Sequence, residues 1–175
     1  MKKRHKTWTL LVVVFFAILF VSSCWLLGIT LTLTYDINDE SWSTDTDFKK
    51  VAVNLTEEED WRDNQDKLDE IYVLYFYGRI TNNESTPATV KLYVYKDTTL
   101  HTIAEVESKA TLVLGGLALP AGPDTVEVPL TAMKLEPIRD LIMEGKFALY
   151  AIAAPTPFDI KVFDASVVVI FAVEP

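Results

Sequence analysis

The order of apolar and polar residues predicts a chain built mainly of β-strands. Over residues 29–37, apolar side chains alternate with three threonines and one aspartate. Because successive side chains of a strand point to opposite faces, this alternation predicts a half-buried strand. Residues 71–81 are apolar at most positions, which is typical of a strand at the centre of a sheet. A polar turn follows, and residues 88–96 predict a second strand that pairs with residues 71–81 as a hairpin.

The remaining segments complete the predicted fold. Short strands are expected at residues 51–55, 100–106, 109–114, 125–130 and 147–153, and a longer one at 160–173 with a break near Asp164. An acidic loop is expected at 38–47, and a short solvated helix or an ordered loop at 56–70. One more helix begins at Glu136-Pro137 and ends at Gly145, and it would cross from one sheet to another. About eight strands and one crossover helix predict a mainly β protein, a β-sandwich of Ig-like or Greek-key type.

The first 24 residues carry a different pattern. A basic head at residues 2–6 precedes an unbroken apolar run at 10–21, which ends on Val21-Ser22-Ser23-Cys24. This order is typical of an export signal, because basic residues stay in the cytoplasm while the apolar run enters the membrane. The motif places the only cysteine of the chain where a bacterial lipobox has one.

These residues resemble the signal of a bacterial lipoprotein. The resemblance implies that a signal peptidase recognises Val21, Ser22 and Ser23. It also implies that the thiol of Cys24 takes a diacylglycerol and that this residue becomes the new N-terminus after cleavage. The exported domain would then be tethered to the membrane through its first residue.

Two other interpretations of the head stay open. Residues 8–29 together are long enough to cross a membrane as an uncleaved signal anchor, since a spanning helix needs about 20 apolar residues. Ordinary cleavage after Ser23 is the third interpretation. In each case the bulk of the chain lies outside the cytoplasm. With the signal removed, residues 24–175 form a single exported domain that faces the periplasm or the cell exterior. Residues 1–23 are then the signal peptide or part of the anchor helix.

Charge and cysteine content limit the partners of the exported domain. The signal holds four of the 16 Lys and Arg residues and none of the 25 Asp and Glu residues, so the mature net charge is 12 minus 25, or −13. A surface this acidic argues against nucleic acid and anionic lipid headgroups as partners. Because Cys24 is the only cysteine, the domain has no disulfide and depends on its hydrophobic core.

No arrangement of residues in the sequence indicates catalysis. His5 lies in the signal, so His101 is the only histidine of the domain, and a zinc site with several histidines is excluded. We expect His101 on the surface of a strand. The sequence has no Gly-x-Ser-x-Gly elbow, no phosphate-binding glycine-rich loop and no dinucleotide fingerprint. We therefore predict no cofactor, no metal site and no enzyme activity.

Carboxylates keep one catalytic alternative open. Acidic residues cluster at 36–47 and recur every third residue at Asp60, Asp63, Asp66 and Asp69. We interpret both groups as solvated surface. A carboxylate-dependent envelope hydrolase would instead need two Asp or Glu side chains facing each other across a cleft, about 5 to 9 Å apart.

Four tyrosines form one candidate binding face. Tyr75, Tyr77, Tyr93 and Tyr95 alternate on the two strands that we predict to pair. On a shared outer face they would stack on sugars or peptides, whereas on an inner face they would belong to the core. The stretch 78–92 is similar to many Ig-like modules and loosely to the water-stress (WHy) sandwich. This resemblance implies a fold and no function.

Together these patterns predict a membrane-anchored, extracytoplasmic envelope lipoprotein without enzyme activity. Its domain would be a binding or structural module that meets a partner protein or an envelope polymer. Its contact with the membrane would be the N-terminal lipid or an anchor helix. A single-pass, signal-anchored sandwich protein and an envelope hydrolase stay as alternatives.

Overall fold

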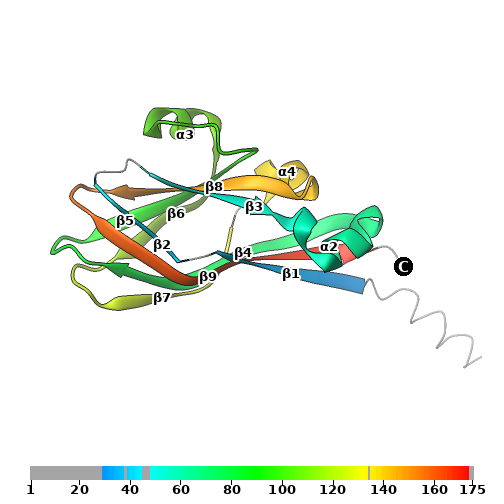
Figure 1. Cartoon of the computed structure of the whole chain (residues 1–175), viewed down its shortest axis with the longest axis horizontal. Helices are drawn as coiled ribbons and strands as arrows, with labels where there is room; N and C mark the ends of the chain where they lie inside the picture. The colour runs from blue at the N-terminus through cyan, green and yellow to red at the C-terminus, as the bar shows by residue number, and fades with distance from the viewer. Residues whose placement is uncertain (1–28, 38, 45–47, 134, 174–175) are drawn as a thin grey trace, which may run out of the picture.

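The computed structural model describes residues 29–37, 39–44, 48–133 and 135–173. They form a mainly β protein in which two antiparallel sheets face each other (Figure 1). The predicted signal peptide, or anchor helix, lies outside the described residues.

The first sheet is built around two long strands. Its order is β1–β9–β4–β7, and β2 pairs with the opposite half of β9. The strands are β1 (Ile29–Ile37), β2 (Glu40–Ser43), β4 (Leu68–Asn82), β7 (Thr125–Ala132) and β9 (Asp159–Val173). The alternation predicted for β1 is confirmed, because Leu33 and Ile37 are buried while the threonines between the apolar positions are exposed. The central position predicted for residues 71–81 is also confirmed, since β4 pairs on both sides.

The second sheet has the order β3–β8–β5–β6. Its strands are β3 (Lys49–Asn54), β5 (Ala88–Tyr95), β6 (Thr111–Leu119) and β8 (Lys146–Ala154). The predicted hairpin of residues 71–81 with 88–96 is therefore wrong, because β4 and β5 belong to different sheets. A polar turn between two apolar strands has the same composition whether the chain folds back beside itself or crosses to the facing sheet. Local sequence did not distinguish the two.

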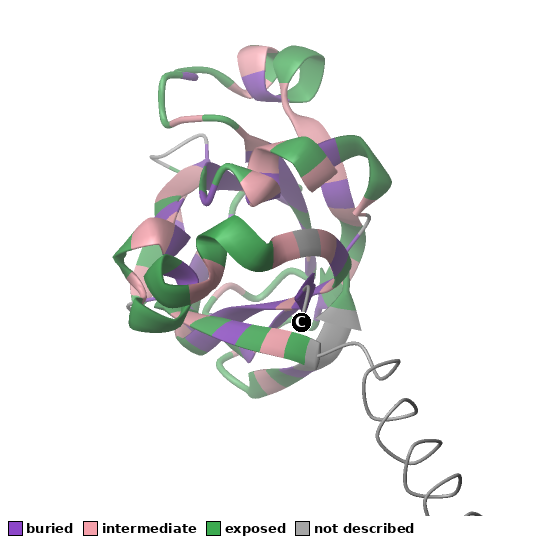
Figure 2. Cartoon of the chain, turned by 90° about the vertical axis from the view of Figure 1, so that its right-hand side faces the viewer, coloured by how far each residue is buried: buried purple, intermediate pink, exposed green. Residues whose placement is uncertain are grey.

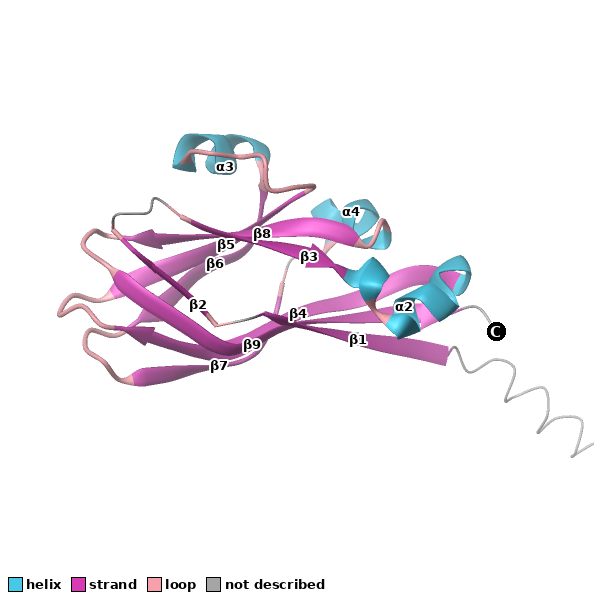
Figure 3. Cartoon of the chain, in the orientation of Figure 1, coloured by secondary structure: helices cyan, strands magenta, loops and turns pink. Residues whose placement is uncertain are grey.

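The helices are short and lie around the two sheets (Figure 3). The acidic stretch forms α2 (Glu59–Asn64), flanked by the 3₁₀ turns η1 (Leu55–Glu57) and η2 (Gln65–Lys67). The predicted crossover helix is confirmed: η3 (Glu136–Ile138) and α4 (Arg139–Met143) join β7 of the first sheet to β8 of the second. None of the helices in the described part of the chain is long and apolar enough to span a membrane.

Two expectations for short segments are wrong. The strand predicted at 100–106 is a loop followed by α3 (Ile103–Lys109), whose first turn is capped by Thr102. Leu100, Ile103 and Val106 recur every third residue, which is a helical rather than an alternating spacing. The loop predicted at 38–47 contains β2.

The break predicted near Asp164 is confirmed by the backbone. Asp164 adopts a φ of 49°, in the left-handed region, although β9 continues on either side of it. The ladder with β1 ends at Ala165 and the ladder with β2 begins at Val162. The bend thus divides β9 into one half for each partner strand.

Two hydrophobic clusters hold the molecule together. The larger one fills the space between the sheets with side chains from both, and in Figure 2 the strands carry much of the buried surface. The smaller one covers the outer side of the second sheet beneath α3. Its buried members are Phe48, Tyr93, Leu100, Val106, Ala148, Tyr150 and Ile152.

Candidate functional site

A cavity of about 50 Å³ lies between the two sheets. Its walls come from both sheets and are almost entirely apolar. The lining residues are Ile37, Glu40, Trp42, Lys49, Val51, Phe76, Ile80, Val90, Leu92, Leu117, Leu149, Ala151 and Val162. A space of this size, lined in this way, suits an apolar group better than ordered water, which needs several polar partners.

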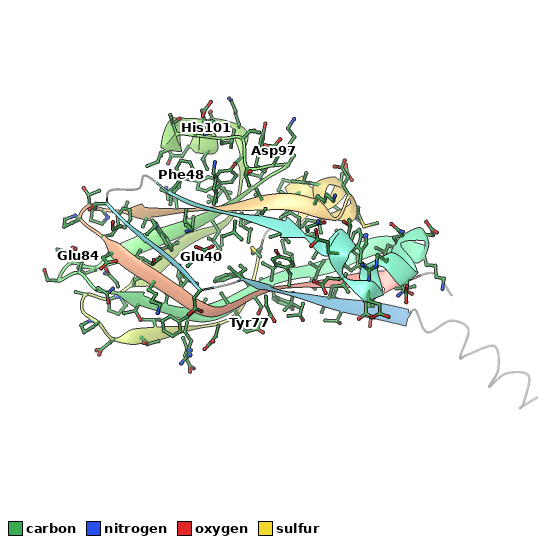
Figure 4. The ribbon with its side chains drawn as sticks, in the orientation of Figure 1. Glu40, Phe48, Tyr77, Glu84, Asp97 and His101 are labelled. Carbon is green, nitrogen blue, oxygen red and sulfur yellow. The ribbon has the colours of Figure 1, made fainter. Side chains whose placement is uncertain are left out.

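An ion pair joins the two sheets at this cavity. The carboxylate of Glu40 on β2 pairs with the ammonium group of Lys49 on β3. The two side chains are 28% and 29% exposed, so their charged ends reach solvent while part of each stem is covered. In Figure 4, Glu40 lies between the two layers. Among the residues that the structure describes, these two are the only ionisable groups that line the cavity.

Trp42 forms part of the wall from the side of β2. Its side chain is buried, and it sits opposite Ile160 in the ladder with β9. The indole N–H has no hydrogen-bond acceptor within the described part of the chain. An unpaired buried donor of this kind costs about 1–3 kcal/mol. The indole ring of Trp42 is therefore held in place by packing, while its backbone belongs to the ladder with β9.

A polar hollow occupies the outer side of the first sheet. Asp36, Asp39, Asp164, Tyr77 and Ser166 are among the residues that line it. Two of its carboxylates already have partners, since Ser166 Oγ donates a hydrogen bond to Asp36 Oδ1 at 2.6 Å and Arg79 pairs with Asp164. No group of three or more His, Cys, Asp or Glu residues among those the structure describes is arranged to hold a metal ion.

The comparisons give no family. No family model and no curated protein matches the chain.

Partial similarity to solved structures extends over most of the chain. A turnip yellow mosaic virus structure shares 14% identity over 83% of this chain and 82% of its own, with a TM-score of 0.34. An infectious bursal disease virus Gx strain structure shares 10% identity over 82% of this chain and 33% of its own, with a TM-score of 0.37. A desmodium yellow mottle tymovirus structure shares 14% identity over 83% and 88%, with a TM-score of 0.33. Similarity at these scores identifies neither fold family nor function.

The four candidate tyrosines do not share a face. Tyr75 and Tyr77 are half-buried on β4 of the first sheet, and Tyr77 lines the polar hollow. Tyr93 and Tyr95 lie on β5 of the second sheet. Tyr93 belongs to the cluster beneath α3, where Tyr95 packs against it. Burial raises the pKa of the Tyr93 hydroxyl above its ordinary value, and the nearby charge of Glu107 adds to the effect. A single aromatic platform is therefore absent from these two strands.

The other predicted residues fall into three groups. Val21, Ser22, Ser23 and Cys24 lie outside the described residues. His101 is exposed, as expected, but it lies in the loop before α3 rather than on a strand, and its backbone N–H donates to Glu105 Oε2 at 2.9 Å. Asp60, Asp63 and Asp66 are exposed around α2 and η2, which confirms a solvated acidic surface there.

Sequence reasoning missed the residues of the cavity. Glu40, Trp42 and Lys49 fall in or beside a segment that looked like an acidic loop. The one available signal was the alternation Glu40-Ser41-Trp42-Ser43, in which a single large apolar residue occupies the inward position of a four-residue strand.

Proposed function

We propose that this chain is an exported, membrane-anchored envelope lipoprotein. Residues 1–23 serve as the signal peptide, and Cys24 carries the lipid. Residues 24–175 form one extracytoplasmic domain, a β-sandwich of Ig-like or Greek-key type without enzyme activity. The domain acts as a binding or structural module that meets a partner protein or an envelope polymer at the membrane surface.

The observation that carries the proposal is the position of Cys24 relative to the fold. The basic head, the apolar run and Val21-Ser22-Ser23-Cys24 come in the order of a lipoprotein signal. The first strand, β1, begins at Ile29, only five positions beyond Cys24. A folded body that starts directly after a lipid-bearing residue is confined to the membrane surface, which raises its effective concentration there.

The described structure adds two kinds of support. Two antiparallel sheets share one core, and a helical crossover joins them, as in a sandwich. The cavity between the sheets is apolar, and the described residues that line it include one acid and one base, which pair with each other. Such apolar walls favour binding over acid–base chemistry, which needs a titrating group within hydrogen-bond reach of the reacting atoms.

Intact-mass analysis of the chain purified from its native membrane tests the proposal. We expect a mature protein that begins at Cys24 and carries acyl mass, and we expect Cys24→Ala to lose both the acyl mass and the cleavage. Ser41→Ala, an exposed position on β2, serves as the matched control and should be processed like the unaltered chain. A full-length, unmodified chain in every sample would instead make residues 8–29 an uncleaved anchor.

A further inference from the structure

We propose that the cavity between the sheets binds a slim, uncharged apolar group, such as the hydrocarbon end of a small amphiphile. The group enters between β2 and β3, and the polar part of the molecule stays outside, beside Glu40 and Lys49. This inference rests on the binding form of the proposed function. It adds the site and the chemical class of the ligand.

The walls determine the chemistry of the ligand. Phe76, Val90 and Leu149 line the interior, and both sheets contribute apolar side chains. Because the walls present almost no polar surface to the cavity, a charged group would lose its hydration there, and a hydroxyl group without a partner would also be penalised. The part of the ligand that enters must therefore be apolar.

The volume of the cavity limits the width of the ligand. An apolar cavity of about 150 Å³ accepts benzene, so a cavity of about 50 Å³ accepts a narrower group, such as the end of an alkyl chain. Unfilled apolar space destabilises a core in proportion to its volume. A small side chain, Ala151, lies on the wall where a larger one would fill part of this space.

The entrance is closed by a weak contact. β2 pairs only with β9, and β3 pairs only with β8, so no strand ladder joins them within the described ranges. The Glu40–Lys49 ion pair crosses the gap between them. Ion pairs that reach solvent contribute little to stability, so parting these two side chains requires little free energy. The same two charges would then flank the polar end of the ligand.

Two alcohols of equal length test the inference on the full chain in lipid nanodiscs. 1-Hexanol has a free methyl end, whereas hexane-1,6-diol has a hydroxyl at both ends. With 5-fluorotryptophan incorporated, ¹⁹F NMR reports each tryptophan separately, and Trp42→Phe assigns the signal of the cavity wall. We expect 1-hexanol to shift the Trp42 signal saturably and the diol to bind at least about tenfold more weakly, because one hydroxyl would be buried unpaired.

Filled variants provide the controls. Ala151→Leu should abolish the shift, and Val51→Ile, which keeps a β-branched residue in β3, gives a second filled cavity if the first variant folds poorly. Ala104→Leu makes the same chemical change as Ala151→Leu on an exposed position of α3 and should leave the shift intact. The Trp61 signal, which comes from α2, should stay constant in all samples.

Each other outcome overturns the inference. Equal binding of the two alcohols would show that the site does not select an apolar end. A response that does not saturate, or that persists in both filled variants, would come from alcohol in the lipid. The intact mass of the same sample keeps the two proposals apart. An acylated chain that ignores 1-hexanol would remain a tethered module with a closed core, whereas an unmodified chain that binds it would keep the cavity site without the lipid anchor.

Discussion

The hydroxyl of Tyr150 donates a hydrogen bond to the backbone carbonyl oxygen of Asp97 at 2.8 Å. The same hydroxyl accepts one from the backbone N–H of Leu100 at 3.2 Å. Tyr150 is fully buried on β8, so these bonds connect the second sheet to the loop that leads into α3. Lys50 Nζ adds a bond to the carbonyl oxygen of Thr98 at 2.8 Å. The loop is thus fixed by polar contacts at the rim of the apolar cluster beneath α3.

Removing this hydroxyl should destabilise the protein without disturbing its sheets. Tyr150→Phe keeps the ring but leaves the Leu100 N–H without its partner, so we expect a loss of about 1–2 kcal/mol in the free energy of unfolding. Urea unfolding measures the loss. Tyr72→Phe removes a hydroxyl from a side chain that is 51% exposed and should change the free energy by much less. Equal effects of the two substitutions would contradict a special role for Tyr150.

Alkaline pH should weaken the fold through buried tyrosines. Burial raises the pKa of the Tyr150 hydroxyl above its ordinary value of 10.0, although the hydrogen bond from Leu100 opposes the rise. Burial also raises the pKa values of Tyr35 and Tyr93. Because the unfolded chain loses these protons first, the stabilisation is complete below about pH 10 and is lost as the pH rises through the folded-state values. Urea midpoints measured from pH 8 upwards should fall beyond pH 10, less steeply for Tyr150→Phe.

A side chain at position 145 should strongly destabilise the protein. Its φ is 75°, and a Cβ added there would lie 2.7 Å from Trp61 Cζ2 and 2.7 Å from Thr56 Cγ2. Gly116 has a similar φ of 77° with open space around the added carbon. Gly116→Ala should therefore cost only the backbone strain, about 1–2 kcal/mol, and Gly145→Ala about 1–3 kcal/mol more for the clash. Thermal or urea unfolding of the two variants separates these contributions. Equal losses would mean that α2 shifts freely.

Local patterns predicted strands well and their partners poorly. The alternation in β1, the central character of β4 and the helix that ends at Gly145 all follow from side chains close together in sequence. The assignment of β5 to the facing sheet depends on contacts between strands that are distant along the chain. No pattern within residues 82–88 encodes that choice.

The same distinction explains the candidate sites. The predicted tyrosine face required β4 and β5 to pair, and they belong to different sheets. The cavity could not be predicted because Glu40, Lys49 and Ala151 come from three separate segments and meet only when the two sheets pack together. A void is a property of packing between sheets, so no spacing of residues along the chain predicts it.

The two pairs of tyrosines should differ in their contribution to stability. Tyr93 is buried beneath α3, so Tyr93→Ala should cost about 3–5 kcal/mol, like other large aromatic truncations in a core. Tyr77 is half-buried beside the polar hollow, so Tyr77→Ala should cost about 1 kcal/mol or less. Urea unfolding of the two variants makes the comparison. Similar costs would indicate that the outer side of the first sheet is covered as fully as that of the second.

The anchor should orient the domain with one particular end toward the membrane. Ile29 lies five positions after Cys24, and five residues of extended chain reach at most about 18 Å. Ile29 pairs with Val173, which also pairs with Leu68 at the start of β4. With Cys24 lipidated, as we propose, we therefore expect that end of the first sheet, with the adjacent turn η2, to lie near the lipid headgroups.

Paramagnetic lipid headgroups in the nanodisc measure this orientation. β4 extends over 15 residues, so its far end at Asn82 lies on the order of 45 Å from Leu68. Glu84, just beyond it, lies at the end of the molecule opposite α2 (Figures 1 and 4). We expect a gadolinium-chelating lipid to broaden the amide signals of Lys67 and Leu68 strongly and those of Glu84 and Gly122 hardly at all. An uncleaved anchor over residues 8–29 predicts the same gradient, so the result tests the direction of the tether independently of its chemistry. Stronger broadening at Glu84 than at Leu68 would mean that the domain folds back onto the membrane by its opposite end.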